Sequence, residues 1–231
     1  MRTFARKVCI IPARGGPKRL PGKNIALLAG KPLLQYSIDV ARASGLFEAV
    51  IVSSEDREIL SVAENGGATV RVRPAELATD SAQLRFVCAD VLTWLEQSGK
   101  SPDAFCVLLP GQPFRSVSDL KESLAVLEAK DVDTVLSVLV MKHPPHRTLA
   151  LENDLLVPFL GPQYFRPAQE IQKLYRHDGS VAWSTPTAFA KQGSFVQGNV
   201  APFFSDEKRS IDIDEPIDLV WAEFLLSQMR H

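Results

Sequence analysis

Apolar runs alternate with amphipathic segments along most of the chain. The apolar runs predict strands at 8–11, 49–52, 69–72, 104–109 and 132–140. Helices are predicted over 32–45, 54–65 and 81–97, where apolar residues recur at helical spacing between turn and capping residues. This alternation is typical of an α/β fold with a mostly parallel central sheet and helices on both faces.

The alternation fades between residues 141 and 175, a stretch rich in Pro, His and Arg. Loops of this length inside a compact domain are usually functional or stabilised by another chain, although a plain surface excursion is the alternative. We therefore expect one domain over residues 1–231 with an insertion at 141–175.

The first predicted strand ends in a glycine-rich loop that carries four cations, Arg14, Lys18, Arg19 and Lys23. Gly15 and Gly16 allow the backbone to approach a ligand closely, so the loop suits a polyphosphate. It matches neither the P-loop nor the dinucleotide-binding pattern. The alternative is a basic surface loop whose glycines only turn the chain.

Composition and charge limit the binding partners and the cellular location expected for this protein. The chain has 231 residues, 26 basic and 27 acidic side chains and a formal net charge of −1, which disfavours an extended nucleic-acid track. No apolar stretch approaches a membrane span or a signal peptide core, so a cytoplasmic protein is expected. Cys9, Cys88 and Cys106 are far apart in sequence and are expected to be reduced core residues.

Near the carboxyl terminus, Asp212 and Asp214 alternate with isoleucine. On a strand both carboxylates would point to the same side, and such oxygens suit Mg²⁺. The alternative is that these aspartates cap the helix expected near Pro216.

Three blocks of the sequence together resemble the CMP-sialic acid synthetases, also called acylneuraminate cytidylyltransferases. They are residues 11–24, 73–81 and 209–214, and they occur in the order typical of that family. The resemblance implies a Rossmann-like nucleotidyltransferase fold with a dimerisation arm at 141–175 that reaches over the active site of the neighbouring subunit. A homodimer is therefore expected.

The resemblance also implies roles for individual residues. Arg14 and Lys23 would bind the triphosphate of CTP, while Asp212 and Asp214 would hold Mg²⁺. The remaining nucleotide contacts would come from Ala13, Gly15, Gly16, Asn24, Arg73 and Ser81.

The expected sugar site departs from the family's pattern. The loop that follows the fourth predicted strand, over residues 108–115, is one residue shorter than in the sialate enzymes. In this respect the chain is more like the pseudaminic acid cytidylyltransferases. Arg176 is the candidate partner for a sugar carboxylate, although it also fits an exposed Arg before an Asp-Gly turn. The other candidates are Gln112, Gln169, Phe203 and Phe204, the last two with core packing as the alternative.

The implied reaction is attack by the anomeric hydroxyl of a nonulosonic acid on the α-phosphorus of CTP, giving a CMP-sugar and pyrophosphate. Two alternatives stay open. One is a related nucleotidyltransferase for 3-deoxy-manno-octulosonate or a sugar 1-phosphate, and the other is a nucleotide-binding protein without catalytic activity.

Overall fold

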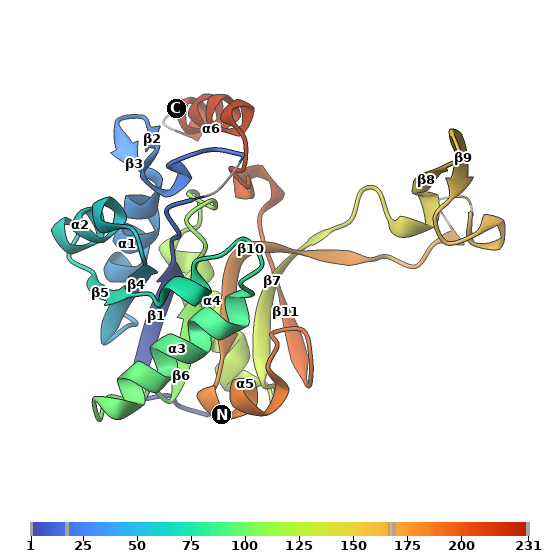
Figure 1. Ribbon diagram of the computed structural model, residues 1–231. Helices are drawn as coiled ribbons and strands as arrows, with labels where there is room; N and C mark the ends of the chain where they lie inside the picture. Colours follow the sequence, from blue (N-terminus) through green and yellow to red (C-terminus); the bar gives the residue numbers. More distant parts are fainter. Residues whose placement is uncertain (1, 17–18, 166, 168–169, 230–231) are drawn as a thin grey trace.

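A computed structural model describes residues 2–16, 19–165, 167 and 170–229. Its centre is a seven-stranded sheet with the order β11-β7-β10-β6-β1-β4-β5 (Figure 1). The strands of this sheet are β1 (Lys7–Pro12), β4 (Ala49–Ser54), β5 (Thr69–Val72), β6 (Ala104–Val107), β7 (Thr134–Val140), β10 (Tyr175–Ser184) and β11 (Val200–Phe204). Only β10 runs antiparallel to its neighbours, so the predicted mostly parallel α/β sheet is confirmed.

Helices cover both faces of the sheet. They are α1 (Leu33–Ser44), α2 (Arg57–Asn65), α3 (Leu84–Gln97), α4 (Val117–Ala129), α5 (Pro186–Gln192) and α6 (Pro216–Met229). Buried side chains of α1, α2 and α4 pack on one face, and those of α3 and α5 pack on the other. Among the described helices, none combines the length and the apolarity needed to cross a bilayer.

Local sequence explains where several helices begin and end. The Asp56 carboxylate accepts hydrogen bonds from the backbone N–H groups of Glu58 and Ile59 at the start of α2. Ser116 and Asp119 form a capping box on α4. Gly45 ends α1 with a φ of 67°, a conformation that a residue without Cβ adopts at low cost.

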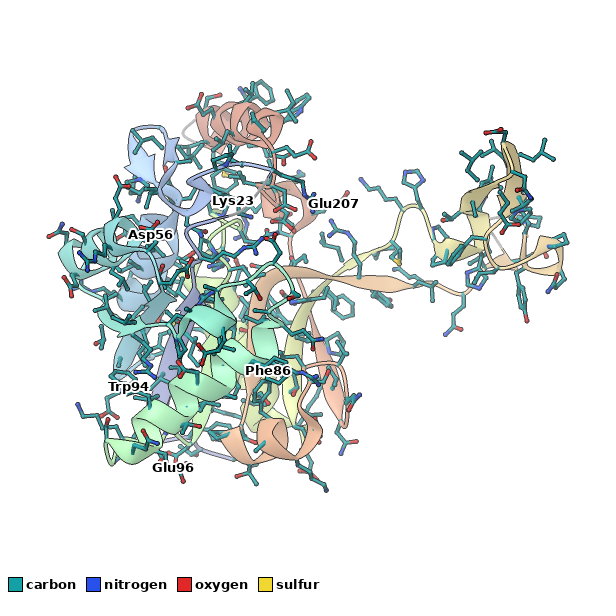
Figure 2. The ribbon with its side chains drawn as sticks, in the orientation of Figure 1. Lys23, Asp56, Phe86, Trp94, Glu96 and Glu207 are labelled. Atoms are coloured by element: carbon teal, nitrogen blue, oxygen red, sulfur yellow. The ribbon has the colours of Figure 1, made fainter. Side chains whose placement is uncertain are left out.

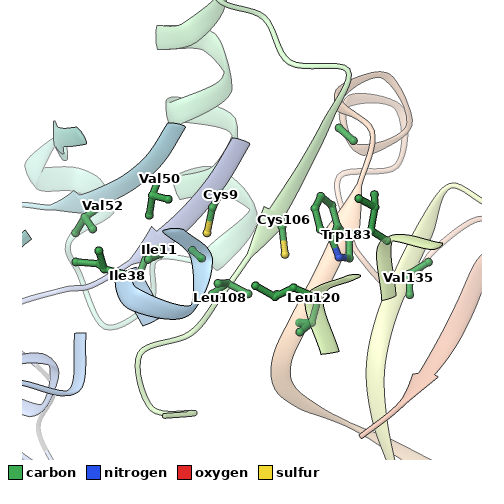
Figure 3. Packing of buried hydrophobic residues seen from close by; sticks show 14 of the residues in the cluster. Cys9, Ile11, Ile38, Val50, Val52, Cys106, Leu108, Leu120, Val135 and Trp183 are labelled. Atoms are coloured by element: carbon green, nitrogen blue, oxygen red, sulfur yellow. The ribbon is translucent and has the colours of Figure 1, made fainter. Parts of the chain in front are cut away.

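Side chains of β1 alternate between the two layers of the core. Cys9 and Ile11 pack against the α1, α2 and α4 side, and Val8 and Ile10 pack against the α3 and α5 side. Figure 3 shows the first layer continuing through Cys106 to Trp183. The three cysteines are buried and unpaired, as expected from the sequence.

The segment after β7 leaves the sheet and projects from the body before the chain returns in β10 (Figure 1). The projection carries a small hairpin of β8 (Leu149–Glu152) and β9 (Leu155–Pro158). We call this projecting segment, residues 141–174, the arm.

A second hairpin, formed by β2 (Leu27–Leu28) and β3 (Lys31–Pro32), precedes α1.

Several predicted boundaries shift by two or three residues. The third helix begins at Leu84 rather than near Ser81, because residues 79–82 form a turn in which Ala82 N–H donates to the Thr79 carbonyl. The strand predicted at 104–109 ends at Val107, where the chain turns into the loop of Pro110 and Gly111.

Trp183 anchors the layer of the core that faces α4. It is fully buried, its ring stacks on Phe47 at a centroid distance of 5.4 Å, and its indole N–H donates to Ser123 Oγ at 3.0 Å. Trp221 differs, because it is 57% exposed on α6 and lies edge-on to Phe224.

We predict that Trp183→Phe lowers the free energy of unfolding by about 1–3 kcal/mol, through loss of the indole hydrogen bond and incomplete filling of its space. Trp221→Phe serves as the control and should change it by less than about 0.5 kcal/mol. Urea denaturation measures both values. Equal effects of the two substitutions would contradict this account of the core.

Candidate active site

A cavity of about 440 Å³ lies at the carboxyl ends of the parallel strands. The loops after β1, β5 and β6 meet there, as expected for an open α/β sheet, and the segment before α6 closes one side. Its charged and polar lining residues are Arg14, Arg19, Lys23, Asn24, Arg73, Asp80, Asp212 and Asp214. Figure 2 shows Lys23 at this end of the molecule.

The cations of the first loop face carboxylates across this cavity. Lys23 Nζ lies 2.8 Å from Asp214 Oδ1, and the exposed Arg19 reaches Asp214 Oδ2 at 3.4 Å. Arg14 Nη1 lies 2.8 Å from Asp80 Oδ1. Positive and negative side chains therefore line one cavity together and pair within it. Lys18, a fourth cation of the loop in sequence, lies outside the described residues.

The backbone of the same loop is held by the end of β4. Ala13 is fully buried, and its N–H donates to the Ser53 carbonyl at 3.0 Å. Gly15 N–H donates to Glu55 Oε1 at 2.7 Å, and a Cβ added to Gly15 would lie 2.4 Å from Asp56 Oδ2. Gly15 is thus required for close packing on β4, and the cationic side chains are what the loop presents to the cavity.

Other residues predicted to contact the nucleotide differ in burial. Asn24 is 5% exposed and donates to the Arg14 carbonyl at 2.8 Å, so it shapes the loop from within. Gly16 and Ser81 are exposed, with Ser81 Oγ 3.2 Å from Thr79 Oγ1. Of these three, Asn24 is the one that lines the cavity.

Arg73 is an unusually buried cation in the cavity wall, with 5% exposure. It donates from Nη2 to the Ser53 carbonyl at 2.7 Å and from Nε to Ser53 Oγ at 3.2 Å. Burial lowers the pKa of Arg73, and the nearby Glu55, 4.0 Å away, opposes that effect. A guanidinium fixed in this way can offer its remaining N–H donors to a ligand.

Asp212 and Asp214 both line the cavity, but they do not belong to a strand. The segment is extended without sheet pairing, and Ile213 N–H donates to the Gly111 carbonyl at 2.9 Å. The intervening Ile213 is fully buried, and it packs with Ile211 in a third apolar cluster beneath α6. Alternation thus places the isoleucines in the core and the carboxylates at the cavity.

The two carboxyl groups have opposite pKa shifts. Burial, followed by the charge of Asp214, raises the pKa of Asp212 above its usual value. The hydrogen bond from Lys23 lowers the pKa of Asp214. Two hard oxygen donors of this kind fit Mg²⁺, which binds one or two carboxylates and takes its other ligands from phosphate and water. A bound cation would also relieve the repulsion that raises the Asp212 pKa.

Helix capping does not explain the Asp214 side chain. The carboxylate that accepts hydrogen bonds at the start of α6 belongs to Asp218, which receives the N–H groups of Asp214 and Glu215 at 2.9 and 2.8 Å. The Asp214 carboxylate instead receives Lys23.

The residues predicted to bind the sugar do not converge in one place. Gln112 is 3% exposed, and its amide donates to the Asp178 carbonyl at 2.5 Å. Phe203 packs in the core, whereas Phe204 is 59% exposed and lies edge-on to Tyr175. Gln169 lies outside the described residues.

Arg176 lines a second cavity, of about 370 Å³, at the root of the arm. Lys142, His143, Glu207 and Ser210 line it as well, and Figure 2 shows Glu207 on the body beside this root. Ser210 of this lining lies two residues before Asp212, and the charge of Arg176 partly opposes the rise in the Asp212 pKa.

Sequence reasoning missed several residues that build the site. Ser53 and Glu55 organise the loop and Arg73, and Asp80 pairs with Arg14. Ser53 and Glu55 lie at and just after the end of β4, which is the available signal for them, and Asp80 lies within the block 73–81. Gly111 has no comparable signal, because its importance arises from contacts with a segment a hundred residues away.

An α/β sheet whose strand ends hold such a cavity, with cations facing a pair of carboxylates, defines a protein of the nucleotidyltransferase class. The model of a family described as cytidylyltransferase matches residues 8–145. The chain belongs to this cytidylyltransferase family, which confirms the resemblance seen in the sequence.

Three known proteins illustrate the relationship. A pseudaminic acid cytidylyltransferase of Campylobacter jejuni is 31% identical over 95% of this chain and 96% of its own length. A CMP-N,N'-diacetyllegionaminic acid synthase of Legionella pneumophila is 32% identical over 96% of both. The solved structure of a CMP:2-keto-3-deoxy-manno-octonic acid synthetase complexed with CTP has a TM-score of 0.73 over 97% of this chain and all of its own, at 16% identity. That likeness confirms the fold.

We predict that Gly111→Ala weakens CTP binding by about tenfold, because crowding in a packed site displaces its neighbours. The added Cβ would lie 2.9 Å from Asp212 Oδ1, 3.2 Å from the Ile213 carbonyl and 3.3 Å from Lys23 Nζ. Isothermal titration calorimetry measures the affinity.

Gly66→Ala is the matched control. Its Cβ would lie 2.4 Å from the Gln35 amide, which ends a flexible side chain that can move aside. Unchanged CTP affinity in Gly111→Ala would show that the contact between Gly111 and the acid pair does not shape the nucleotide site.

Proposed function

We propose that this protein transfers the cytidylyl group of CTP to a nonulosonic acid, with release of pyrophosphate. The observation that carries the proposal is the cavity lined by Arg14, Lys23, Asp212 and Asp214, in which Lys23 pairs with Asp214. The cations match a triphosphate, and the carboxylates match the metal ion that accompanies one.

The reaction forms a bond between the anomeric oxygen of the sugar and the α-phosphorus, and it breaks the bond from that phosphorus to the pyrophosphate oxygen. Arg14 and Lys23 hold the triphosphate and offset the charge on the departing pyrophosphate. Mg²⁺, held by Asp212 and Asp214, would supply further charge stabilisation on the phosphate oxygens. Asp212, which lines the cavity, would also accept the hydroxyl proton.

The acceptor would occupy the second cavity, next to Asp212. Arg176 can pair with the carboxylate of a nonulosonic acid through two parallel hydrogen bonds, and Lys142 adds positive charge. The names of the Campylobacter and Legionella relatives favour a nonulosonic acid over a sugar 1-phosphate. The short loop that contains Gly111 keeps 3-deoxy-manno-octulosonate as the second candidate.

The direct test is release of pyrophosphate from CTP in the presence of Mg²⁺. Acceptors are N-acetylneuraminic, legionaminic, pseudaminic and 3-deoxy-manno-octulosonic acids, and ATP, GTP and UTP serve as controls. We expect turnover with CTP and one nonulosonic acid. Binding of CTP without turnover on any acceptor would instead favour a nucleotide-binding protein without catalytic activity.

Arg14→Ala and Asp214→Ala should each lower turnover by more than about a hundredfold, because the first removes a cation that holds the triphosphate and the second removes a carboxylate that would hold Mg²⁺. Asp39→Ala is the control, since Asp39 pairs with Lys31 on the surface and should retain activity. Full activity in either site variant would refute the assignment.

We also propose that the arm joins two copies of the chain. Its hairpin exposes large apolar side chains, including Leu151, Leu155 and Leu156 at 67–69%. An isolated two-stranded hairpin is marginal in water, and clustered exposed apolar side chains mark interaction surfaces. A second copy that covers the hairpin would satisfy both constraints.

Light scattering coupled to size-exclusion chromatography should therefore give the mass of a dimer. Leu151→Asp combined with Leu156→Asp should give a monomer, because burying these charges in an apolar interface is costly. Asp154→Ala at the tip of the hairpin serves as the control. A monomeric parent protein would contradict this role of the arm.

A further inference from the structure

Asp178 is a buried carboxylate at an irregular point of β10. It is 3% exposed and lies where the pairing of β10 with β7 shifts register between His177 and Ala182. The next residue, Gly179, has a φ of 78°, which turns the chain sharply. Such bulges commonly redirect a side chain next to an active site.

The carboxylate of Asp178 is fully engaged in hydrogen bonds. Oδ1 accepts from the Ser137 hydroxyl and from Ser180 N–H, and Oδ2 accepts from Ser210 Oγ at 3.0 Å. Burial alone would raise its pKa, but these bonds, led by that of Ser137, lower it below the usual value. Asp178 therefore stays ionised inside the protein.

Two of the bonds made by Asp178 lead to the candidate active site. Ser210 lies two residues before Asp212, so its bond with Asp178 holds the start of the acid segment. The main-chain carbonyl of Asp178 accepts from Gln112, the neighbour of Gly111, and the Gly111 carbonyl accepts from Ile213 N–H. Asp178 thus contacts both pieces of chain that border the acid pair.

A buried cation, Arg115, lines the same small cavity as Asp178. Arg115 is 6% exposed, and it donates to Ser37 Oγ at 2.9 Å and to the Leu109 carbonyl at 2.5 Å. Two buried polar atoms here, Arg115 Nε and the Ser205 hydroxyl, have no hydrogen-bond partner among the described residues. Arg115, Ser205 and Asp178 line one small cavity of about 10 Å³, which is room for a single water that would complete the network.

We infer that Asp178 is a positioning residue that fixes the acid pair through Ser210 and Gln112. It is absent from the lining of the larger cavity, so it acts on the site through those two neighbours. The consequence for metal binding rests on the proposed function, whereas the placement of residues 210–214 does not. Groups that orient metal ligands in this way often change metal affinity by about 10- to 100-fold when they are removed.

The experiment compares Asp178→Ala, Asp178→Asn and Ser210→Ala with the parent protein. Hydrogen–deuterium exchange of the peptide covering 210–214 reports the placement, and electron paramagnetic resonance with Mn²⁺ and CTP reports metal affinity. In Asp178→Ala we expect at least about tenfold faster exchange, about tenfold weaker Mn²⁺ binding and a larger loss in kcat than in KM. Ser210→Ala should move the first two readouts in the same direction.

Asp178→Asn should restore both readouts to within about threefold of the parent protein. Its amide oxygen can still accept from Ser137 and Ser180, and its amide nitrogen can donate to the Ser210 hydroxyl. Asp133→Ala is the matched control, because the Asp133 carboxylate lies at the opposite end of the sheet. It accepts hydrogen bonds from the Gln192 side-chain amide and from the Asn199 backbone N–H. It should lower stability without affecting exchange at 210–214.

Equal exchange at 210–214 in Asp178→Ala and Asp133→Ala would overturn the inference. If Asp178→Ala does not fold, parental exchange at 210–214 in Ser210→Ala would overturn it equally. A parent protein that binds neither Mn²⁺ nor CTP would refute the proposed function, and the exchange measurement would still decide the role of Asp178.

Discussion

The ion pair between Lys23 and Asp214 joins the two ends of the chain across the candidate active site. These residues are 191 positions apart and meet at 2.8 Å. Without the cation, Asp212 and Asp214 would face each other in a partly buried site, where like charges oppose ionisation. The lowered pKa of Asp214 and the raised pKa of Asp212 show that Lys23 favours one member of the pair. The cationic loop and the acid segment therefore stabilise each other's charges.

A second constraint places that loop relative to the rest of the cavity. The Ser53 carbonyl at the end of β4 accepts from both Ala13 N–H and Arg73, and Glu55 accepts from Gly15 N–H. One strand end thus aligns the residues that follow β1 with the residue that follows β5. Because β4 lies between those two strands, parallel pairing alone brings these groups together.

The sequence predicts the sheet well because a strand buried on both faces must be apolar throughout, as 8–11 and 104–107 are. It singles out Arg14 and Lys23 because they lie in a glycine-rich loop after a buried strand, whereas the roles of Asp212 and Asp214 follow from the family resemblance. It cannot separate Phe203 from Phe204, although consecutive strand residues face opposite sides, since nothing local indicates which side is the core. The sequence names Gln112 but does not reveal its bond to the Asp178 carbonyl, and it does not point to Asp178, because the partners in these contacts lie 66 and 41 residues apart.

The arrangement of the two cavities links the arm to the chemistry. Lys142 and His143, which line the cavity of Arg176, are also among the first residues of the arm after β7 ends at Val140. The strand that returns from the arm begins at Tyr175, directly before Arg176. The two strands that carry the arm therefore both supply lining residues of this cavity. If the acceptor binds there, as the proposed function holds, the arm and the acceptor site depend on the same pair of strands.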